Sequence, residues 1–245
     1  MSMHPAFSQT SHRPWPVPER PWVLEQEWLD LLFLHWEIDY SFLRKQIPEG
    51  LEIDTYDGRA WIAVVPFCME KVGPRGCPKP SAVSDFPEIN IRTYVKRSGK
   101  PGVWFFSLDI PHRLPVWLGR AFFHLPYFRA EMMVEANQDE IIYRSTVGER
   151  RFDATYSGLE PVEIEPDSFE HWATERYCFY AQSQKGQLFR AEVQHPKWPL
   201  QRARYQIREN AMLEAYPVGK QHPSALFSKR IPVVAWWPLL LEVGD

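Results

Sequence analysis

Cysteine, long hydrophobic runs and an excess of positive charge are scarce or missing in this sequence. Its 3 cysteines, Cys68, Cys77 and Cys178, are odd in number and lack paired spacing, which excludes a disulfide framework and favours a reducing compartment. The longest apolar run, Ile231–Leu241, is well short of the about 20 residues that cross a bilayer. The N-terminus has no apolar segment of the kind found in signal peptides. We therefore expect a soluble, cytoplasmic protein without a membrane partner.

The sequence also lacks the signatures of nucleic-acid binding and of common cofactors. Its 28 Lys and Arg are outnumbered by 31 Asp and Glu, and the densest basic groups are pairs such as Arg150-Arg151. Nucleic-acid binders normally carry a basic excess or stripe, and neither is present. No H-E-x-x-H, C-x-x-C, Walker A or G-x-G-x-x-G pattern occurs. We predict no nucleic-acid partner, no metal site and no cofactor.

Glycine is sparse, whereas proline and aromatic residues are abundant. The 245 residues include 12 Gly, 23 Pro and 11 Trp, and aromatics make up 15%. This proline content favours short strands and turns over long helices. The aromatic content is typical either of an aromatic core or of an apolar pocket. The prolines between Pro14 and Pro21 predict a flexible, Pro-rich arm over residues 1–20, followed by a single domain over residues 21–245.

Hydrophobic periodicity predicts strands joined by tight turns in the first part of that domain. Trp28–Ile38 is a near-continuous apolar run with the length of a buried strand, and Asp39 can cap a short helix over Tyr40–Gln46. Asp57-Gly58 supplies the positive φ angles of a hairpin turn. The Pro- and Gly-rich stretch Met69–Asp85 is predicted to be a loop, long enough to cover a site.

Strict alternation of polar and apolar residues marks the strand Glu88–Val95. Its polar positions share one face, and they are Glu88, Asn90, Arg92 and Tyr94. The following strand, Val103–Asp109, is apolar on both faces, and Leu114–His124 has helical spacing. Further short strands at even intervals indicate a sandwich or barrel. The polar face is therefore either the solvent side of an amphipathic strand or the wall of an internal cavity.

Two segments, Leu32–Asp54 and Pro87–Arg129, resemble the acetoacetate decarboxylase-like superfamily, and within it the YqjF-like branch, a domain family of unknown function (DUF2071). The order of elements is similar over most of the chain. The resemblance implies an α+β fold that is mainly β: a closed, partly antiparallel β-barrel with a few helices outside it. It also implies a pocket inside that barrel.

The resemblance assigns roles to residues around the pocket. Glu88 matches a glutamate of the decarboxylase active site, which favours the cavity wall as the place of the polar face. Pro126-Tyr127-Phe128 stands where the decarboxylases have Pro-Lys-Lys, whose first lysine forms a Schiff base with the substrate. A phenol cannot form an iminium, so decarboxylation by that route is not expected. Arg120 matches a Gly-Arg-Glu motif whose Glu is Ala121 here, and it is either a structural clamp or a substrate contact.

We therefore expect an enclosed polar and aromatic pocket for a small organic acid or carbonyl compound, with two functional alternatives. In an enzyme, Glu88 would exchange protons and Tyr127 would polarise a carbonyl. An arginine in such a pocket can bind a carboxylate through two parallel hydrogen bonds. The substrate contacts would come from Arg92, Tyr94, Arg120 and Asn90. In a non-catalytic binder or sensor, the same residues would hold a metabolite without converting it.

Overall fold

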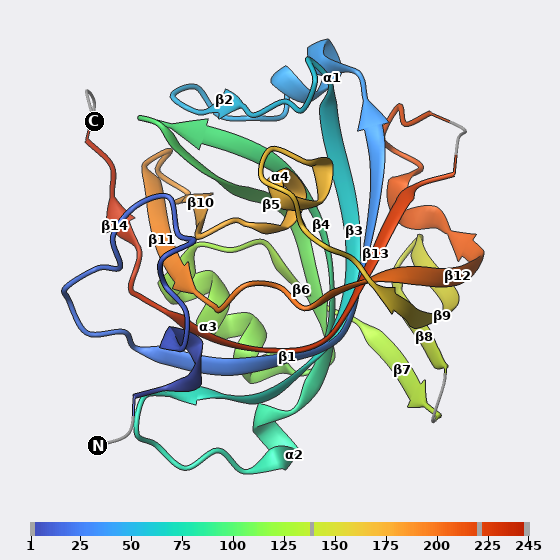
Figure 1. The fold of residues 1–245 in the computed structure, drawn as a ribbon, viewed down its shortest axis with the longest axis horizontal. Helices are drawn as coiled ribbons and strands as arrows, with labels where there is room; N and C mark the ends of the chain where they lie inside the picture. The colour runs from blue at the N-terminus through green and yellow to red at the C-terminus, as the bar shows by residue number, and fades with distance from the viewer. Residues whose placement is uncertain (1–2, 138–139, 220–221, 243–245) are drawn as a thin grey trace.

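Strands dominate the structure, a computed structural model that describes residues 3–137, 140–219 and 222–242 (Figure 1). Seven of the strands pair side by side in a closed ring: β1 (Leu24–Ile38), β3 (Ala60–Pro74), β4 (Phe86–Arg97), β5 (Lys100–Ile110), β10 (Cys178–Gln182), β11 (Leu188–Gln194) and β13 (Ser224–Ala235). Pairing of β11 with β13 closes the ring. The β5–β10 pairing is parallel and the other ring pairings are antiparallel. The ring therefore agrees with the partly antiparallel arrangement that the resemblance implies.

The remaining elements extend or flank this ring of strands. Four further strands continue the sheet from β13, namely β12 (Leu200–Asn210), β9 (Arg150–Pro161), β8 (Ile141–Val147) and β7 (Glu131–Ala136). Short strands pair at edges: β2 (Glu52–Ile53), β6 (Tyr127–Arg129) and β14 (Leu239–Leu240). The helices are short: α1 (Tyr40–Arg44), α2 (Ser81–Ser84), α3 (Arg113–Phe123), α4 (Phe169–Thr174) and 3-10 turns at Pro5–Phe7 and Ala211–Leu213. A mainly β fold is thus confirmed.

Two hydrophobic clusters explain why the ring strands are apolar on both faces. On β1, Leu31 and Phe33 belong to an inner cluster that every ring strand supplies, whereas Leu32 and Leu34 belong to an outer cluster. The outer cluster includes side chains of β8 and β9, so the additional strands cover the outside of the ring. Helices α3 and α4 pack side chains against the inner cluster. A strand covered on both faces reads as a continuous apolar run.

Local sequence signals fix several turns and helix ends as predicted. The Asp39 carboxylate accepts a hydrogen bond from the amide of Phe42 at 2.6 Å and caps α1. Asp57 and Gly58 have φ angles of 48° and 72° in the hairpin before β3. The loop prediction for Met69–Asp85 is wrong in part, because β3 continues to Pro74 and α2 forms a short turn. The first residues of β1 pair with this extension of β3. The proline and glycine content of the segment gives no sign of that pairing.

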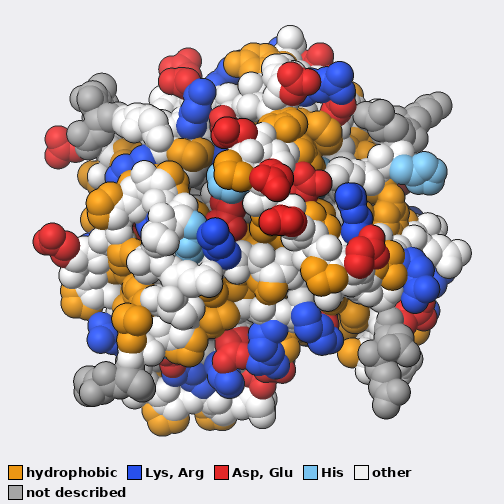
Figure 2. Space-filling view, viewed as in Figure 1, with side chains coloured by type: hydrophobic (Ala, Val, Ile, Leu, Met, Phe, Trp, Pro, Cys, Tyr) orange, Lys and Arg blue, Asp and Glu red, His pale blue; other side chains and the backbone are white. Residues whose placement is uncertain are grey.

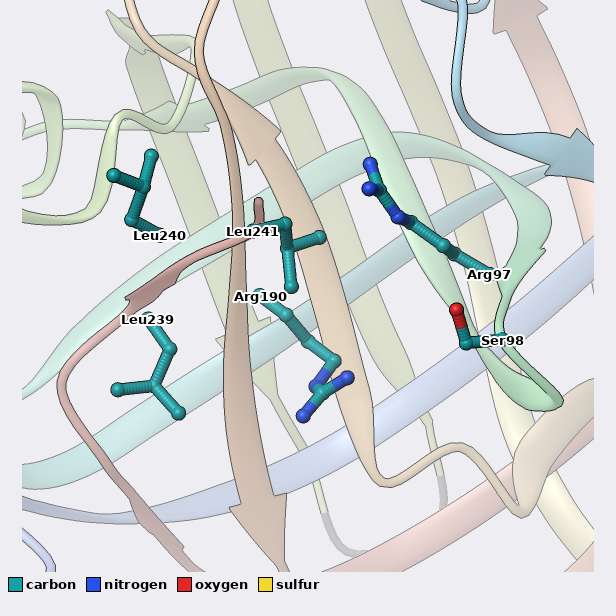
Figure 3. Close-up of a pocket in the computed structure, with 6 residues that line it drawn as sticks. All are labelled: Arg97, Ser98, Arg190, Leu239, Leu240 and Leu241. Atoms are coloured by element: carbon teal, nitrogen blue, oxygen red, sulfur yellow. The ribbon is translucent and has the colours of Figure 1, made fainter. Parts of the chain in front are cut away.

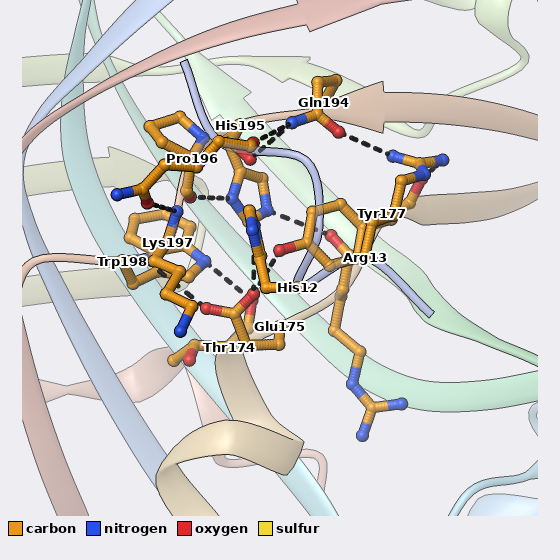
Figure 4. Close-up of polar contacts among 12 residues, drawn as sticks. His12, Arg13, Thr174, Glu175, Tyr177, Gln194, His195, Pro196, Lys197 and Trp198 are labelled. Atoms are coloured by element: carbon orange, nitrogen blue, oxygen red, sulfur yellow. Dashed lines mark hydrogen bonds and ion pairs between the residues drawn. The ribbon is translucent and has the colours of Figure 1, made fainter. Parts of the chain in front are cut away.

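The N-terminal segment packs against the ring instead of extending away from it. Arg13 is buried and forms an ion pair with Glu192, and the indole of Trp15 donates to the same carboxylate at 2.7 Å. The amide of Gln194 donates to the carbonyl of Ala6 at 3.0 Å. Figure 4 shows part of this polar cluster, with His12 and Arg13 of the segment beside Tyr177 and Gln194. The proline content predicts a flexible arm without such contacts. Here the segment is held in place because its buried Arg13 is the partner of a buried carboxylate.

The surface carries charges of both signs. Figure 2 shows acidic and basic side chains interspersed among apolar ones on the face in view. None of the helices in the described part of the chain is long and apolar enough to span a membrane. The last three residues of the predicted domain, 243–245, lie outside the described residues.

Candidate functional site

The polar face of β4 points into the ring and not toward solvent. Its four side chains, Glu88, Asn90, Arg92 and Tyr94, are called the polar wall below. The residues of β3 that pair with the first three are Phe67, Val65 and Ala63, and all of these belong to the inner cluster. Glu88 and Asn90 are each 3% exposed and Tyr94 is fully buried, while Arg92 is partly buried. The solvent-facing alternative is therefore wrong for this strand.

Glu88 and Tyr127 meet directly, although 39 positions separate them. Strand β6 pairs in parallel with β5, which places Tyr127 level with Leu108, itself the partner of Asn90. The Tyr127 hydroxyl donates to one carboxylate oxygen of Glu88 at 3.1 Å, and the Asn90 amide donates to the other at 3.3 Å. The two predicted catalytic residues are thus in contact.

Burial sets the protonation behaviour of the Glu88 carboxyl. Desolvation raises its pKa to about 7, and the nearby Asp109 acts in the same direction. The hydrogen bonds from Asn90 and Tyr127 and the charge of Arg92 oppose this rise in pKa. A carboxyl group with such a pKa exists in both protonation states near neutral pH. It can therefore donate or accept a proton there.

Asp109 is a second buried carboxyl close to the first, and sequence patterns did not single it out as a site residue. It lies on β5 and forms an ion pair of 3.1 Å with Arg150 of β9. Desolvation raises its pKa to about 6, against the lowering effect of Arg150. The pKa of both buried carboxyls is therefore raised, mainly by desolvation, and Asp109 adds to the rise in the pKa of Glu88.

Arg92 is the cation of the polar wall. Its guanidinium carbon lies 5.3 Å from the ring centre of Phe33 and 5.8 Å from that of Tyr94. Within the described residues no carboxylate forms an ion pair with it, and its buried Nε has no hydrogen-bond partner. The buried Oδ1 of Asn90 also lacks a partner there. Buried polar atoms are normally paired, so these two atoms are exceptions in the interior.

Tyr94 is held in place by His35 and Arg176, and the sequence did not predict that these residues lie beside it. Its hydroxyl lies 2.6 Å from Nε2 of His35 on β1. Desolvation lowers the pKa of His35 to about 3, and the charges of Arg92 and Arg176 act in the same direction, so this imidazole is neutral. The guanidinium of Arg176 lies over the Tyr94 ring and pairs with Asp54 at 2.5 Å. Tyr94 thus serves as a fixed part of the wall.

Arg120 lies apart from the polar wall. It is exposed on α3, and its Nε donates to the backbone carbonyl of Tyr127 at 2.6 Å. Its guanidinium lies over the ring of Phe128. The preceding Gly119 lets the helix approach closely, because a Cβ there would lie 2.4 Å from the Tyr127 ring. This geometry is that of a clamp that positions Tyr127, and no contact of Arg120 with the interior is present among the described residues.

Two surface hollows lie away from the polar wall. One, of about 180 Å³, is lined by Arg97, Ser98, Arg190 and Leu239–Leu241 (Figure 3). The other, of about 410 Å³, lies over the outer strands and is lined in part by Ser157 and Arg204. The described residues contain no cluster of His, Cys, Asp and Glu that could hold a metal ion. The enclosed pocket behind the polar wall stays a prediction.

One protein-family model and one known protein each match most of this chain. The model of the DUF2071 family, described as an uncharacterized conserved protein, matches residues 25–232. The chain is 41% identical to the uncharacterized protein YqjF of Bacillus subtilis over 229 residues, which is 91% of this chain and 94% of that protein. Both matches cover nearly the whole ring of strands.

Solved structures show the same architecture at low sequence identity. Acetoacetate decarboxylase from Legionella pneumophila matches with a TM-score of 0.66 at 13% identity, covering 99% of this chain and 97% of that one. The enduracididine biosynthesis enzyme MppR in complex with pyruvate matches with a TM-score of 0.65 at 11% identity, covering 91% of each chain. The fold is therefore acetoacetate decarboxylase-like, as the two sequence segments predict.

Proposed function

The chain belongs to the DUF2071 family, and we propose that it binds a small carboxylic acid bearing a carbonyl group against the polar wall, inside the ring of strands. The observation that carries this proposal is Arg92. Its guanidinium faces an apolar interior, and no carboxylate of the described residues pairs with it. A partly buried guanidinium without a carboxylate partner has lost part of its hydration, so an anionic ligand would stabilise it.

The proposed ligand pairs its carboxylate with Arg92 and directs its carbonyl toward Glu88 and Tyr127. A guanidinium binds a carboxylate through two parallel hydrogen bonds and stays charged in a buried site. The pKa of Tyr127 is raised well above its ordinary value by desolvation and by Glu88, so its phenol is a neutral donor. Glu88 is placed to take a proton from the carbon next to the carbonyl, or to return one.

The same side chains argue against an imine route. A nucleophilic amine needs a desolvated lysine whose pKa is lowered. Every described lysine is exposed or only partly buried. The reaction class that fits the site is proton transfer next to a carbonyl, without a covalent intermediate. MppR, which shares the fold, forms a complex with pyruvate, and pyruvate is a small oxo acid of the proposed class.

A non-catalytic binding protein or sensor is the second candidate. The observation that favours it is the rigidity of the wall, since Tyr94 is fully buried and bonded to His35. In this case the ligand leaves unchanged. For either candidate we propose a cytoplasmic location, which is supported by the free state of Cys68, Cys77 and Cys178.

Pyruvate and acetoacetate are the probes for the test. Binding is measured by calorimetry, and loss of the pyruvate methyl signal in heavy water is followed by NMR, because proton exchange replaces hydrogen by deuterium. Arg92→Ala should weaken binding about 10- to 100-fold, since hydrogen bonds to charged groups are lost. The control Arg202→Ala removes an exposed arginine of β12 and should change nothing.

The variant Glu88→Gln separates the two candidates. An enzyme loses deuterium exchange in this variant and keeps its affinity within a few-fold, whereas a binding protein shows no exchange in either form. If neither oxo acid binds to the wild type, or if Arg92→Ala binds both as well as the wild type, the proposed site is wrong.

A further inference from the structure

One part of the surface is unusually apolar. Seven large hydrophobic side chains, each 39–61% exposed, come from α3 and from the segment around β14: Leu114, Trp117, Leu118, Phe122, Trp237, Leu239 and Leu240. Together they are called the apolar surface below. The ring of Phe122 lies 6.1 Å from Trp117 and 5.8 Å from Trp237, so the helix and the C-terminal segment meet (Figure 1).

The size of this surface exceeds what a monomer normally exposes. With roughly 200 Å² for a side chain of this kind and about half of it exposed, the seven residues present on the order of 700 Å². The largest apolar patch on a typical monomer is about 300–600 Å². A stable protein–protein interface buries about 800 Å² on each partner. The apolar surface therefore has the area of one half of a dimer interface.

We propose that the apolar surface binds a second copy of this chain through a two-fold interface. In such an interface the same patch serves both partners, so the apolar surface alone would supply both halves. Its composition also fits. Trp, Phe and Arg are enriched at the centres of interfaces, and exposed Arg113 and Arg120 lie four and three positions from Trp117, on the same side of α3.

A membrane surface suits the observations less well. Exposed Trp and Leu beside Arg are also found in interfacial helices that bind anionic lipid. The chain has a net charge of −3, which opposes attraction to an anionic bilayer. The apolar surface is also built from two separate segments of the chain, whereas membrane-lying helices carry their apolar face on one continuous helix.

Dimer formation would act on the helix that flanks the candidate site. The opposite side of α3 packs Val116 and Phe123 against the inner cluster, and Gly119 contacts the ring of Tyr127. The helix thus lies between the proposed partner and the polar wall. A second copy would hold α3 against the ring, which keeps water away from the interior.

Sedimentation velocity over a wide range of concentration tests the proposal on the full chain. The variant carrying Trp117→Ser and Phe122→Ser loses two aromatic contacts on each side of the interface, so the dissociation constant of the dimer should rise at least about thirtyfold. The single variant Trp117→Ser gives an independent measurement. The control variant carries Val83→Ser and Leu159→Ser, which remove exposed apolar side chains of α2 and β9. Circular dichroism and thermal unfolding verify that each variant folds.

A wild-type dimer that the control retains and both interface variants lose supports the proposal. A wild type that stays monomeric at the highest concentration overturns it. Co-sedimentation of a monomer with vesicles of phosphatidylglycerol and phosphatidylcholine also overturns it, in favour of a membrane. A dimer that survives both interface variants shows that another surface pairs, which refutes this assignment. None of these results depends on whether an oxo acid binds the polar wall.

Discussion

Glu88→Gln tests the central electrostatic claim about the interior. Burial raises the pKa of Glu88 from 4.5 to about 7. Between these values the folded protein keeps a proton that the unfolded chain has released. The protonated carboxyl therefore contributes stability that is fully present below about pH 4.5 and is lost as the pH rises through about 7. The total loss is about 3 kcal/mol, because each pKa unit corresponds to about 1.4 kcal/mol.

The variant should abolish this pH dependence. A glutamine amide is uncharged at every pH, has nearly the same shape, and its oxygen can still accept the hydrogen bond from Tyr127. Urea unfolding followed by tryptophan fluorescence gives the free energy of unfolding at each pH. We expect the stability of the variant relative to the wild type to rise by about 2–3 kcal/mol between about pH 5 and pH 8. Asp109 titrates in both proteins, so its effect largely cancels.

The matched control is Glu160→Gln, which alters an exposed glutamate of β9. Its stability should follow that of the wild type at every pH. If Glu88→Gln also runs parallel to the wild type, Glu88 does not titrate in this range. The acid–base role assigned to it would then be refuted.

Three further outcomes follow from the contacts. Arg13→Ala leaves the carboxylate of Glu192 buried without its main cation, so the free energy of unfolding in urea should fall by about 3 kcal/mol. The control Arg151→Ala breaks an exposed ion pair and should have no measurable effect. Equal losses of stability in the two variants would contradict the buried role of Arg13. Tyr127→Phe removes a hydrogen bond that favours the ionised form of Glu88, so the pKa of Glu88 should rise further. The pKa is measured from the pH dependence of the ¹³C chemical shift of the carboxyl group. An unchanged pKa would show that the phenol does not donate this hydrogen bond. Borohydride with acetoacetate should leave the protein mass unchanged, since no described lysine is buried; a lysine adduct would restore the imine route.

Signals that act within a few residues were visible in the sequence. Asp39 caps the helix that follows it, as predicted. Asp57-Gly58 adopts the positive φ angles that its composition favours. The alternation of Glu88–Val95 fixes which side chains share a face. Alternation does not state which face is buried, and the resemblance to a known fold was needed to favour the interior.

Contacts between residues that are far apart in the sequence could not be predicted from it. Arg13 and Glu192 lie 179 positions apart, and neither residue has a local pattern that marks it as buried. The contact of His35 with Tyr94 and the stacking of Arg176 on the same ring join three segments that are far apart in the sequence. The sequence around a lone histidine or arginine does not show whether its side chain is buried, because its neighbours come from distant parts of the chain. Covariation between such positions is the signal that could have found them.

The tyrosine at position 127 affects which ligands the proposed site would bind. An amine at this position would add a second cation, but the Tyr127 phenol is neutral because desolvation raises its pKa well above the ordinary value. Arg92 is then the cation of the polar wall, and the charge of Glu88 decides the balance. With Glu88 protonated, the wall carries one positive charge and suits a monoanion. With Glu88 ionised, the wall is neutral and repels an anion at short range. For the proposed organic acid we therefore expect tighter binding with Glu88 protonated, so its affinity should fall as the pH rises through about 7.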